Sequence, residues 1–527
     1  MTRLRKWSAG LSLILTASVF AGCTSSPAET TPKGEPTAST PVTKESPMEI
    51  SWAGLYPPND NNSKVQQYLE KKFNVKFKNM KFDRSNWASQ FNVKIAAGEI
   101  PDFFIYEGGL TVQTLQKQGV LAEIKIEEIQ KYMPKYTKSV LELEPTIWTV
   151  GNVEGKNYGI PQTFPPGATP FLPAYNGKWL KAIGYNEPPK TIKEFEDVMY
   201  KFRNNDPDGN GKKDTYGLSA RGKDQNGFYF FNSVFGAFGV NPYQWNPDKN
   251  GNLQFGMITE ESRQAFKLLS KWYKDGVIDP EFVTEDEPKR RQNWVNGRYG
   301  YLDGGLWYHY LPGIGAYSGD FKIKNPDSDV VVGPILSGPN GPGVGLAQGV
   351  KQQPFSMGIQ VEKDEKKRIK ILQILEALST DDEVYLYASY GEKGVDWDMK
   401  NGVPAMINPD YNDAAKLGAS IGGGFFYSFF KTKSPLMDKY SYSQAELEMR
   451  EKWTKGHKIT VNQYPPDTKT KTEHPNLGKM QSEFFLKFIL GQVDLDKGFD
   501  DFVMQWKKEG GDDTTEAANI AYKAMKK

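Results

Sequence analysis

The stretch MEISWAGLYPPNDNNSKVQQYLEKKFNVKF, residues 48–77, indicates the fold class of this chain. It begins with a short apolar strand and a loop rich in Pro and Asn, after which Ser63 is placed to cap a helix. Val65, Leu69 and Phe73 recur at helical spacing on one face of that helix, and a second strand follows directly. A strand, a helix and a strand in this order predict a mostly parallel sheet covered by helices, which is an α/β fold.

The same alternation continues along the chain. A helix is expected over residues 87–97, and residues 98–106 are expected to form a turn and a buried strand. Thr191 and Glu194 have the spacing of a capping box, in which each side chain bonds a backbone N–H at the start of a helix. Further amphipathic helices are expected over residues 259–276 and 363–378.

Composition excludes several classes of protein. The 527 residues are enough for two to four domains, and 66 basic residues nearly balance 64 acidic ones. This balance argues against binding of nucleic acid or anionic membranes through bulk charge. A single cysteine, Cys23, excludes disulfides within the chain, and three scattered histidines make a histidine-rich metal centre unexpected. The 12 Trp, 27 Tyr and 30 Phe exceed what a lean core needs, so some are expected to line a ligand surface.

The N-terminus is expected to be a targeting segment. Residues 1–22 consist of a basic start, an apolar run too short for a good membrane span, and the small residues Ala21 and Gly22. Small residues before a lone cysteine resemble the lipobox of bacterial lipoproteins, which implies a lipid on Cys23. An ordinary secretory signal with an incidental cysteine is the alternative. Residues 23–47, rich in Ser, Thr, Pro and Glu, are predicted to be a disordered tether.

One loop has the spacing of a calcium site. Asp206, Asp208, Asn210 and Asp214 occupy positions 1, 3, 5 and 9 of the loop, and the carbonyl of Lys212 can supply a further oxygen. The glutamate of a true EF-hand is missing at position 12. We therefore expect a structural calcium ion as the cofactor, with a metal-free Asx/Gly-rich turn as the alternative.

Several short motifs, taken in order, resemble one family. The chain is similar to the extracellular solute-binding proteins of bacterial ABC transporters, in the oligosaccharide-binding group (family 1) and near the alginate-oligosaccharide binders. The resemblance is carried by these segments, together with the calcium loop: AGEIPD (97–102), NYGIP (157–161), YNGKWL (175–180), PKTIKEF (189–195), WVNGRYGY (294–301) and YGEKGVDW (390–397).

The resemblance implies a two-lobed, periplasmic-binding-protein-like α/β fold with hinge strands and a cleft between the lobes. Lobe one is expected to hold residues 48–165 and 352–395, and lobe two residues 166–351 and 396–527. It implies a monomer, anchored by lipid on the outer face of the cell membrane, that captures an oligosaccharide and delivers it to the permease subunits of an ABC importer. No nucleic-acid partner is expected.

Ligand-contacting residues are expected just after strands, because ligands of α/β sheets bind beyond the carboxyl ends of strands. Aromatic rings stack on sugar faces, and carboxylates bond hydroxyl groups. Trp307 is the foremost candidate, since it also matches by position a stacking aromatic of sugar-binding relatives. The full expected set is Tyr56, Tyr106, Glu107, Asp303, Trp307, Tyr308, Trp397, Phe425 and Tyr427, with Phe426 beside the last two.

The remaining aromatics fit the ligand surface less well or are expected in the core. Trp148, Phe164 and residues 228–231 are weaker candidates for the ligand surface, whereas Trp179, Trp272 and Trp453 lie on helical faces and are expected to pack internally.

Three other functions fit the sequence. One is a binder of peptides or other polar solutes with the same fold, another is a secreted, calcium-dependent enzyme that degrades glycans, and the third is a purely adhesive or sensory lipoprotein with the same fold. A pair of carboxylates could hydrolyse a glycoside, and acidic residues are too numerous to exclude such a pair. No nucleophile elbow, zinc motif or other catalytic constellation is recognisable, so the chain is predicted not to be an enzyme.

Overall fold

A computed structural model describes residues 46–223, 231–460 and 473–525. Residues 47–527 form one compact unit, distinct from residues 1–46. The expected signal, the lipidated Cys23 and nearly all of the tether therefore lie outside the described residues. Among the helices of the described part, none combines the length and the apolar character needed to cross a membrane.

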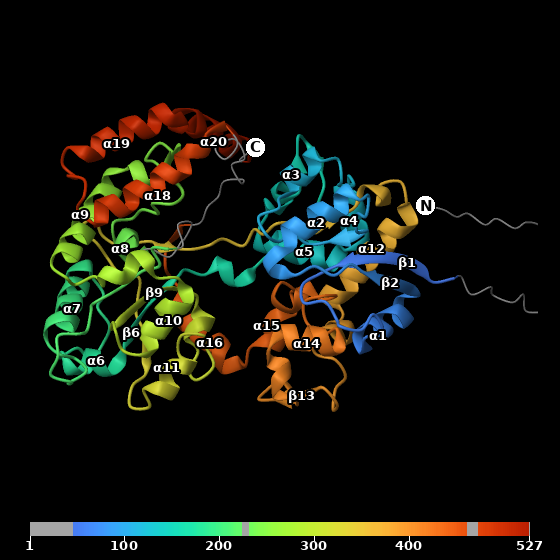
Figure 1. Cartoon of the computed structure of the whole chain (residues 1–527), viewed down its shortest axis with the longest axis horizontal. Helices are drawn as coiled ribbons and strands as arrows, with labels where there is room; N and C mark the ends of the chain where they lie inside the picture. Colours follow the sequence, from blue (N-terminus) through green and yellow to red (C-terminus); the bar gives the residue numbers. More distant parts are fainter. Residues whose placement is uncertain (1–45, 224–230, 461–472, 526–527) are drawn as a thin grey trace, which may run out of the picture. The chain divides into compact units, whose positions relative to one another are not determined.

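The first lobe is built on a four-stranded sheet in the order β12-β3-β1-β2. Figure 1 labels β1 and β2 of this sheet. Strand β1 pairs in parallel with both β2 and β3, as the strand–helix–strand pattern predicts, while β12 arrives from far along the chain and pairs antiparallel with β3. The bounds are β1 Met48–Ala53, β2 Val75–Asn79, β3 Phe103–Phe104 and β12 Ser356–Met357.

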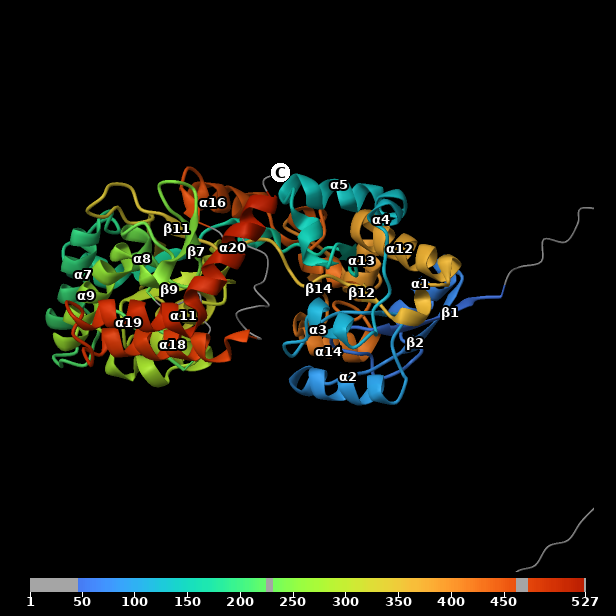
Figure 2. The ribbon, with the colours of Figure 1, turned by 90° about the horizontal axis from the view of Figure 1, so that it is seen from above.

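Helices cover this sheet. Ser63 caps α1 through a bond from the backbone N–H of Gln66, and the helix buries Val65 and Leu69 against the sheet. Figure 2 shows α1 beside β1 and β2, and α12 packs against α4, α5 and α13. The helices are α1 Lys64–Phe73, α2 Trp87–Ala96, α3 Val112–Lys117, α4 Ile126–Tyr132, α5 Pro134–Leu143, α12 Glu365–Thr380, α13 Asp382–Tyr390, α14 Ala414–Ile421 and α15 Met437–Ser441.

The second lobe is built on a three-stranded antiparallel sheet in the order β10-β6-β9. The strands are β6 Leu172–Asn176, β9 Tyr301–Gly305 and β10 Val330–Val332. Strands β6 and β9 are buried along their whole length. The 3-10 helix η6, Trp307–Tyr310, directly follows β9 and brings its aromatic residues to the end of this sheet.

The helices of the second lobe form two hydrophobic clusters with this sheet. The expected capping box of Thr191 and Glu194 opens α7, and Thr259 caps α9. Trp179 and Trp272 are buried as expected. The helices are α6 Gly177–Ala182, α7 Ile192–Asn204, α8 Asn232–Ala237, α9 Glu260–Lys274, α10 Glu287–Val295, α11 Gly319–Lys324, α16 Gln444–Thr454, α18 Pro475–Ile489, α19 Gly498–Trp506 and α20 Asp512–Met525.

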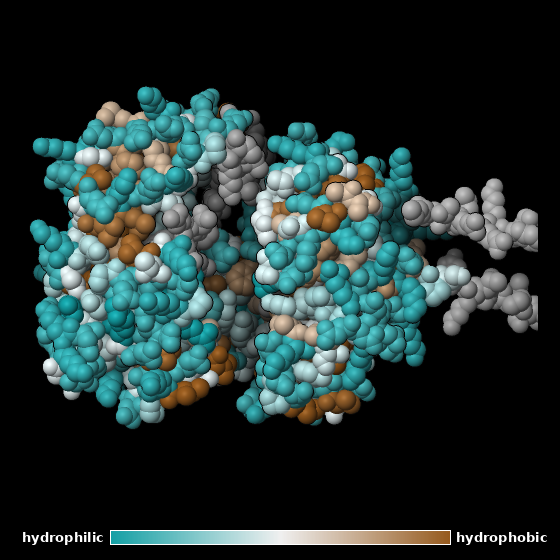
Figure 3. All heavy atoms as spheres, viewed as in Figure 1, coloured by the Kyte–Doolittle hydropathy of each residue, from teal (hydrophilic) through white to brown (hydrophobic). Residues whose placement is uncertain are grey.

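Short strand pairs complete the described chain: β4 Asn152–Val153 with β5 Lys156–Asn157, β7 Trp245–Pro247 with β8 Leu253–Phe255, β11 Gly345–Leu346 with β15 Ile459–Thr460, and β13 Trp397–Lys400 with β14 Val403–Met406. The face of the molecule in Figure 3 is largely hydrophilic, with small scattered apolar areas.

Within the described residues, the chain passes between the two cores three times. It leaves the first core after Ile160 and returns to it at Phe355, and the two crossing segments form antiparallel bridges with each other. The third crossing lies between α15 and α16, because Tyr440 packs against the first core and Tyr442 against a core of the second lobe.

The third crossing corrects the expected domain division. Residues 396–527 were assigned to the second lobe, but Trp397, Phe426, Tyr427, Phe429 and Phe430 are all buried in the first core. Residues 396–441 therefore belong to the first lobe, and only the chain after them contributes to the second. The hydrophobic pattern of these residues shows that they are buried but does not show in which core.

Candidate functional site

A pocket of about 380 Å³ is walled largely by aromatic rings, and we call it the aromatic pocket. Such a volume is in the range of small-molecule sites. The first lobe contributes Tyr390, Pro404, Met406, Tyr411, Asn412, Lys431, Met437, Tyr440 and Ser441, the second lobe contributes Tyr308 and Tyr442, and the first crossing segment contributes Phe164 and Pro166.

The elements around the pocket explain its aromatic wall. Tyr390 is the last residue of α13, and Tyr440 lies in α15. Tyr308 lies in η6, where it follows the buried strand β9. Tyr308 and Tyr440 are half-buried, so each of these rings is supported on one side and accessible on the other, whereas Tyr390 is buried with 5% of its surface exposed. Rings held in this way can stack on the C–H faces of sugars, while the amide of Asn412 and the hydroxyl of Ser441 can bond sugar hydroxyl groups.

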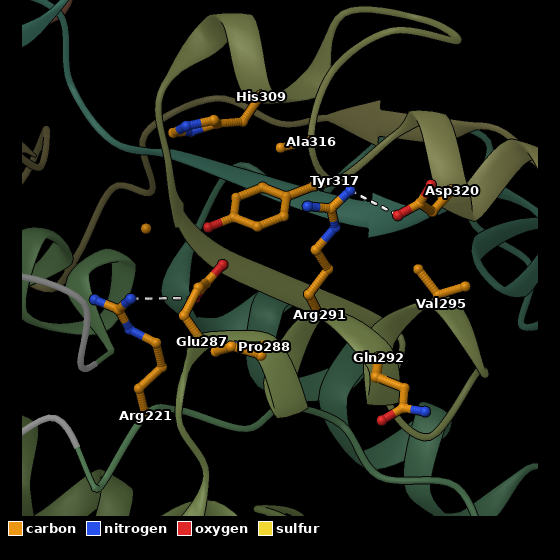
Figure 4. Close-up of a pocket in the computed structure, with 11 residues that line it drawn as sticks. Arg221, Glu287, Pro288, Arg291, Gln292, Val295, His309, Ala316, Tyr317 and Asp320 are labelled. Carbon is orange, nitrogen blue, oxygen red and sulfur yellow. Dashed lines mark hydrogen bonds and ion pairs between the residues drawn. The ribbon is translucent and has the colours of Figure 1, made fainter. Parts of the chain in front are cut away.

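A second pocket, of about 800 Å³, lies within the second lobe, and we call it the polar pocket (Figure 4). It is lined by residues of β9, α10, α11 and the segment between β9 and α11: Glu287, Pro288, Arg291, Gln292, Val295, Gly304, His309, Ala316, Tyr317 and Asp320, together with Arg221. Two ion pairs cross its wall, Arg221 Nη1 to Glu287 Oε2 at 3.2 Å and Arg291 Nη2 to Asp320 Oδ2 at 2.6 Å.

A buried arginine supports this wall. Arg290 is fully buried and donates to Glu287 Oε2 at 2.9 Å, to the Tyr317 hydroxyl at 3.2 Å and to the carbonyl of Asp303 at 2.7 Å. Burial alone would raise the pKa of Glu287, but Arg290, Tyr317 and Arg221 outweigh it and hold that pKa below its ordinary value. The carboxylate is therefore ionised at neutral pH and is already engaged by cations of its own chain.

The two pockets meet at η6. Tyr308 lines the aromatic pocket and His309 lines the polar pocket, and their ring centroids are 4.2 Å apart. His309 Nδ1 accepts a hydrogen bond from the backbone N–H of Leu306 at 2.9 Å. Burial lowers the pKa of His309 to about 4, so the imidazole is neutral at physiological pH.

Three of the expected ligand residues lie together and are at least partly accessible. Arg84 Nη1 donates to the Tyr56 hydroxyl at 2.7 Å, and Arg84 Nη2 lies 3.4 Å from Glu107 Oε1. The Phe425 ring meets the Tyr56 ring edge-on at 6.2 Å. Arg84 could not be predicted from sequence, because this arginine does not directly follow a strand and belongs to no motif. Neither pocket described above includes this group.

The foremost expected ligand residue, Trp307, is fully buried, which corrects the expectation that it stacks on a sugar. Its ring lies 4.5 Å from that of Tyr442, and the Arg450 guanidinium lies 5.4 Å from its ring centroid. Asp303 is also buried, and its carboxylate accepts backbone bonds from Ser233 at 2.8 Å and Gly304 at 2.6 Å. Both side chains support the second lobe, and only Tyr308 among the expected residues of this segment reaches a pocket.

Three further expected residues also face the interior of the first lobe. The Tyr106 hydroxyl lies 2.6 Å from Ser356 Oγ, and Trp397 Nε1 donates to a backbone carbonyl at 3.0 Å. The Tyr427 hydroxyl lies 2.7 Å from Asn79 Oδ1, and the neighbouring Phe426 is fully buried. Position after a strand or a glycine turn indicates a bend in the chain, but it does not indicate what covers the side chain.

Of the weaker candidates, one also lines a pocket and others pack in the interior. Phe164 lines the aromatic pocket, Trp148 packs against the first core, and Phe231 is buried. Residues 228–230 lie outside the described residues. Trp453, expected to pack internally, is partly buried against a core of the second lobe.

In the loop at 206–214, carboxylate oxygens of Asp208 and Asp214 lie around the side-chain amide of Asn210. Asn210 Nδ2 donates to Asp208 Oδ2 at 2.8 Å and lies 3.2 Å from Asp214 Oδ1, while Asp206 accepts the backbone N–H groups of Asn210 and Gly211. Burial and the neighbouring carboxylates raise the pKa of Asp208. These hard oxygens fit the ligand preference of calcium. No cluster of three or more His, Cys, Asp or Glu side chains within the described ranges is arranged to hold a metal ion.

Comparison with known proteins identifies the family. Residues 64–358, more than half of the chain, match the family described as bacterial extracellular solute-binding protein. The chain belongs to this family. Lipoprotein LipO of Bacillus subtilis is 26% identical over 99% of both chains.

Solved structures share the fold along nearly the whole chain. A human-milk-oligosaccharide-binding, ABC-transporter-associated solute-binding protein of Bifidobacterium longum infantis has a TM-score of 0.68 at 16% identity, covering 91% of this chain and 99% of its own. FusA of Streptococcus pneumoniae, an ABC-transporter substrate-binding protein solved with kestose, has a TM-score of 0.64 at 19% identity, covering 92% and 99%. The expected two-lobed fold of a solute-binding protein is thereby confirmed, and the relatives are binding proteins rather than enzymes.

Proposed function

We propose that this family member captures an oligosaccharide outside the cell and presents it to the permease subunits of an ABC importer. The aromatic pocket carries this proposal, because Tyr308, Tyr411 and Tyr440 offer accessible ring faces beside a few polar groups. Sugars are bound in this way, by stacking on their apolar faces and hydrogen bonding at their rims. Two relatives of the same fold are named for oligosaccharide ligands or were solved with one, which agrees with this chemistry.

The two lobes provide the means of capture. Tyr308 and Tyr442 belong to the second lobe, whereas Tyr390 and Tyr440 belong to the first. A solute held by both sets of rings binds best where the sets face each other, so it favours that conformation of the molecule. The permease can then distinguish loaded from empty protein by conformation alone.

Calorimetric titration with an oligosaccharide panel tests the proposal. We expect one binding event per chain, weakened by Tyr308→Ala or Tyr411→Ala by about 1–3 kcal/mol, the usual cost of losing a ring from a desolvated contact. Tyr132→Ala in α4 is the matched control, because this half-buried tyrosine lies outside both pockets. Normal affinity in both pocket variants would remove the aromatic pocket as the site, and binding of peptides alone would overturn the choice of ligand.

We further propose that a lipid on Cys23 holds the monomeric protein at the outer face of the cell membrane. Residues 23–47 act as the tether. In a Gram-positive host the wild-type protein should fractionate with membranes and incorporate a palmitate analogue, and Cys23→Ser should abolish both. Membrane association unchanged in Cys23→Ser would contradict the anchor.

The residues at 206–214 are proposed to hold one structural calcium ion. Asp206, Asp208 and Asp214 would supply carboxylates, Asn210 its side-chain oxygen after rotation of the amide, and Lys212 its carbonyl. The ion would neutralise the mutual repulsion of the three carboxylates and fix the turn that follows α7. A role in ligand chemistry is not part of the proposal, because none of these residues lines either pocket.

Capture is proposed to leave the sugar unchanged. Prolonged incubation with each ligand of the panel, followed by mass spectrometry, should return the intact oligosaccharide. Shortened or unsaturated products would support the alternative of a glycan-degrading enzyme.

A further inference from the structure

One cation projects into the aromatic pocket. Lys431 belongs to the 3-10 helix η9, Phe429–Thr432, which is fixed to the first core by the buried rings of Phe429 and Phe430. Its backbone carbonyl accepts a hydrogen bond from the Tyr385 hydroxyl at 3.1 Å. The backbone of Lys431 is therefore held rigidly, and its ammonium group lies 4.4 Å from the centroid of the Tyr390 ring.

The ammonium group of Lys431 has no counter-ion among the described residues. The ammonium group packs against the Tyr390 ring, and Lys431 alone carries a charge among the described residues that line the pocket. Three other shielded cations among the described residues are paired with carboxylates: Lys367 lies 3.1 Å from Asp102 Oδ2, Arg368 lies 2.8 Å from Glu128 Oε2, and Arg290 lies 2.9 Å from Glu287 Oε2.

Holding such a charge costs free energy in the empty protein. An ammonium group loses hydration when protein surrounds it, and the loss is offset only when an opposite charge or acceptors replace the water. Burial lowers the pKa of Lys431 to about 8, which expresses the same cost. The nearby Lys433 is similarly shielded, but its Nζ donates to Gln162 Oε1 at 2.5 Å.

We infer that the oligosaccharide bound in the aromatic pocket is acidic, and that Lys431 pairs with the carboxylate of one of its uronic acid units. The inference rests on the proposed function and narrows its ligand class. A hexuronic acid joins the two features of the pocket in a single unit, because its ring has apolar faces for the tyrosines and its C5 carries a carboxylate at the rim. A neutral sugar would fill the same pocket and leave the ammonium group unpaired.

The polar pocket does not offer an equivalent site. The guanidinium groups of Arg221 and Arg291 lie beside their own carboxylates, Glu287 and Asp320. An acidic ligand there would have to displace a carboxylate of the protein, and it would gain little net charge interaction. Lys431 in the aromatic pocket needs no such displacement.

Pairs of ligands that differ only in charge measure what the carboxylate contributes to binding. Calorimetry would be run on the full chain with short oligosaccharides of galacturonate, of mannuronate and guluronate, and of glucuronate. Each acid would be compared with its methyl ester, which keeps the ring and linkage but removes the charge. Neutral fructo-, manno- and gluco-oligosaccharides complete the panel. We expect at least one acid to bind, and its ester to bind about 10- to 100-fold more weakly, the range for a hydrogen bond to a charged group.

Variants of Lys431 test whether this residue is the one that pairs with the carboxylate of the ligand. In Lys431→Met the difference between acid and ester should disappear, whereas Lys431→Arg should retain it. Lys455→Met is the control, since Lys455 is an exposed lysine paired with Glu451 on the surface of the second lobe. Circular dichroism and melting temperature establish that each variant is folded. If Lys431→Met does not fold, the comparison of acid with ester on the wild type and on Lys431→Arg still decides the ligand class.

The outcomes separate the inference from the proposed function. Binding of a neutral oligosaccharide with no acid bound, equal affinity for an acid and its ester, or an unchanged preference in Lys431→Met would overturn the inference and leave the proposed function standing. Absence of binding to every sugar of the panel would overturn both.

Discussion

The indole of Trp307 lies 4.5 Å, centroid to centroid, from the ring of Tyr442, although 134 residues separate them in the sequence. Tyr442 lies at the third crossing and also lines the aromatic pocket. Trp307 is fully buried beneath it, so the tryptophan supports the pocket wall from behind.

This relationship predicts different effects for the two rings. Trp307→Ala should lower the free energy of unfolding by about 3–5 kcal/mol, the usual cost of removing a buried aromatic side chain. Tyr442→Ala, which removes a half-buried ring of the pocket, should change ligand affinity more than stability. Denaturant unfolding and calorimetry on the same preparations measure both quantities. A Trp307→Ala protein with wild-type stability but no ligand binding would show instead that the indole contacts the sugar directly.

Calcium should stabilise the protein through the loop at 206–214. A ligand at a hundredfold excess over its dissociation constant adds about 2.7 kcal/mol to stability. We expect the melting temperature to rise with calcium in the wild type but not in Asp206→Ala, and Asp248→Ala, in a different exposed turn, serves as the control. Magnesium should have a smaller effect, because it requires a tighter octahedral shell.

The same site should respond to acid. Burial and the carboxylates of Asp206 and Asp214 raise the pKa of Asp208, so a proton competes with the cation there at a higher pH than at an ordinary aspartate. Calcium affinity should therefore fall as the pH drops through this raised pKa, and uptake should release protons. Calcium affinity that stays constant from pH 7 down to about pH 4, the ordinary range of an aspartate, would contradict this arrangement.

Local structure could be predicted from sequence, but which distant residues bury a given side chain could not. The cap at Ser63, the capping box at Thr191 and the parallel pairing of β1 with β2 follow from residues close together in the chain. Trp307 is hidden by a residue 135 positions later, and Trp397 packs into the first core rather than the second. No periodicity or spacing encodes these contacts, because they depend on which segments cross between the lobes.

The sequence predicted the type of side chain in the candidate site but not most of the residues that form it. Aromatic side chains were expected to bind the sugar, and Tyr308 and Phe164 do line the aromatic pocket. The sequence does not point to the tyrosines at 390, 411 and 440 as ligand residues, since all three lie in helical segments and none follows a strand of the main sheets. Lys431 lies in the run Phe-Phe-Lys-Thr-Lys. Two lysines directly after two aromatic residues are the sequence pattern that could have indicated a shielded cation here.

His309 should make stability depend on pH. Its pKa is about 4 in the folded protein and about 6.5 when unfolded, so between these values the unfolded chain binds more protons than the folded one. Stability contributed by this residue is complete above pH 6.5 and falls as the pH drops, by roughly 2 kcal/mol between pH 6.5 and pH 5. Arg290 and Arg291 act in the same direction as burial, whereas Glu287 opposes them.

The comparison with His309→Asn isolates this effect. The asparagine oxygen can accept the Leu306 N–H that Nδ1 accepts in the wild type, but it does not titrate. Unfolding free energies measured at pH 7, 6 and 5 should fall more steeply in the wild type than in the variant. Parallel curves would show that the imidazole is hydrated enough to protonate in the folded state.

Lys431 should give ligand binding the opposite dependence on pH. Its pKa of about 8 in the empty protein means that the ammonium group is present at pH 7 and mostly neutral at pH 9. Affinity for an acidic oligosaccharide should therefore fall as the pH rises through 8, while affinity for its methyl ester, measured only at pH values where the ester is stable, should change little. Tyr390, with a pKa raised to about 12 by burial, stays neutral over this range.

Two variants separate Lys431 from its neighbour, because the pKa of Lys433 is also lowered to about 8 by burial. Lys431→Arg keeps its charge at pH 9 and should bind the acid with nearly constant affinity, whereas in Lys433→Met the affinity should fall with rising pH as it does in the wild type.

The pH dependence of stability tests the lowered pKa of Lys431 independently of ligand binding. As the pH rises from 8 to 10.5, the folded protein loses this proton before the unfolded chain does, so the Lys431 contribution to stability increases. Lys431→Met should accordingly melt at a higher temperature than the wild type at pH 7, and a lower melting temperature would indicate that an unseen partner already stabilises the ammonium group.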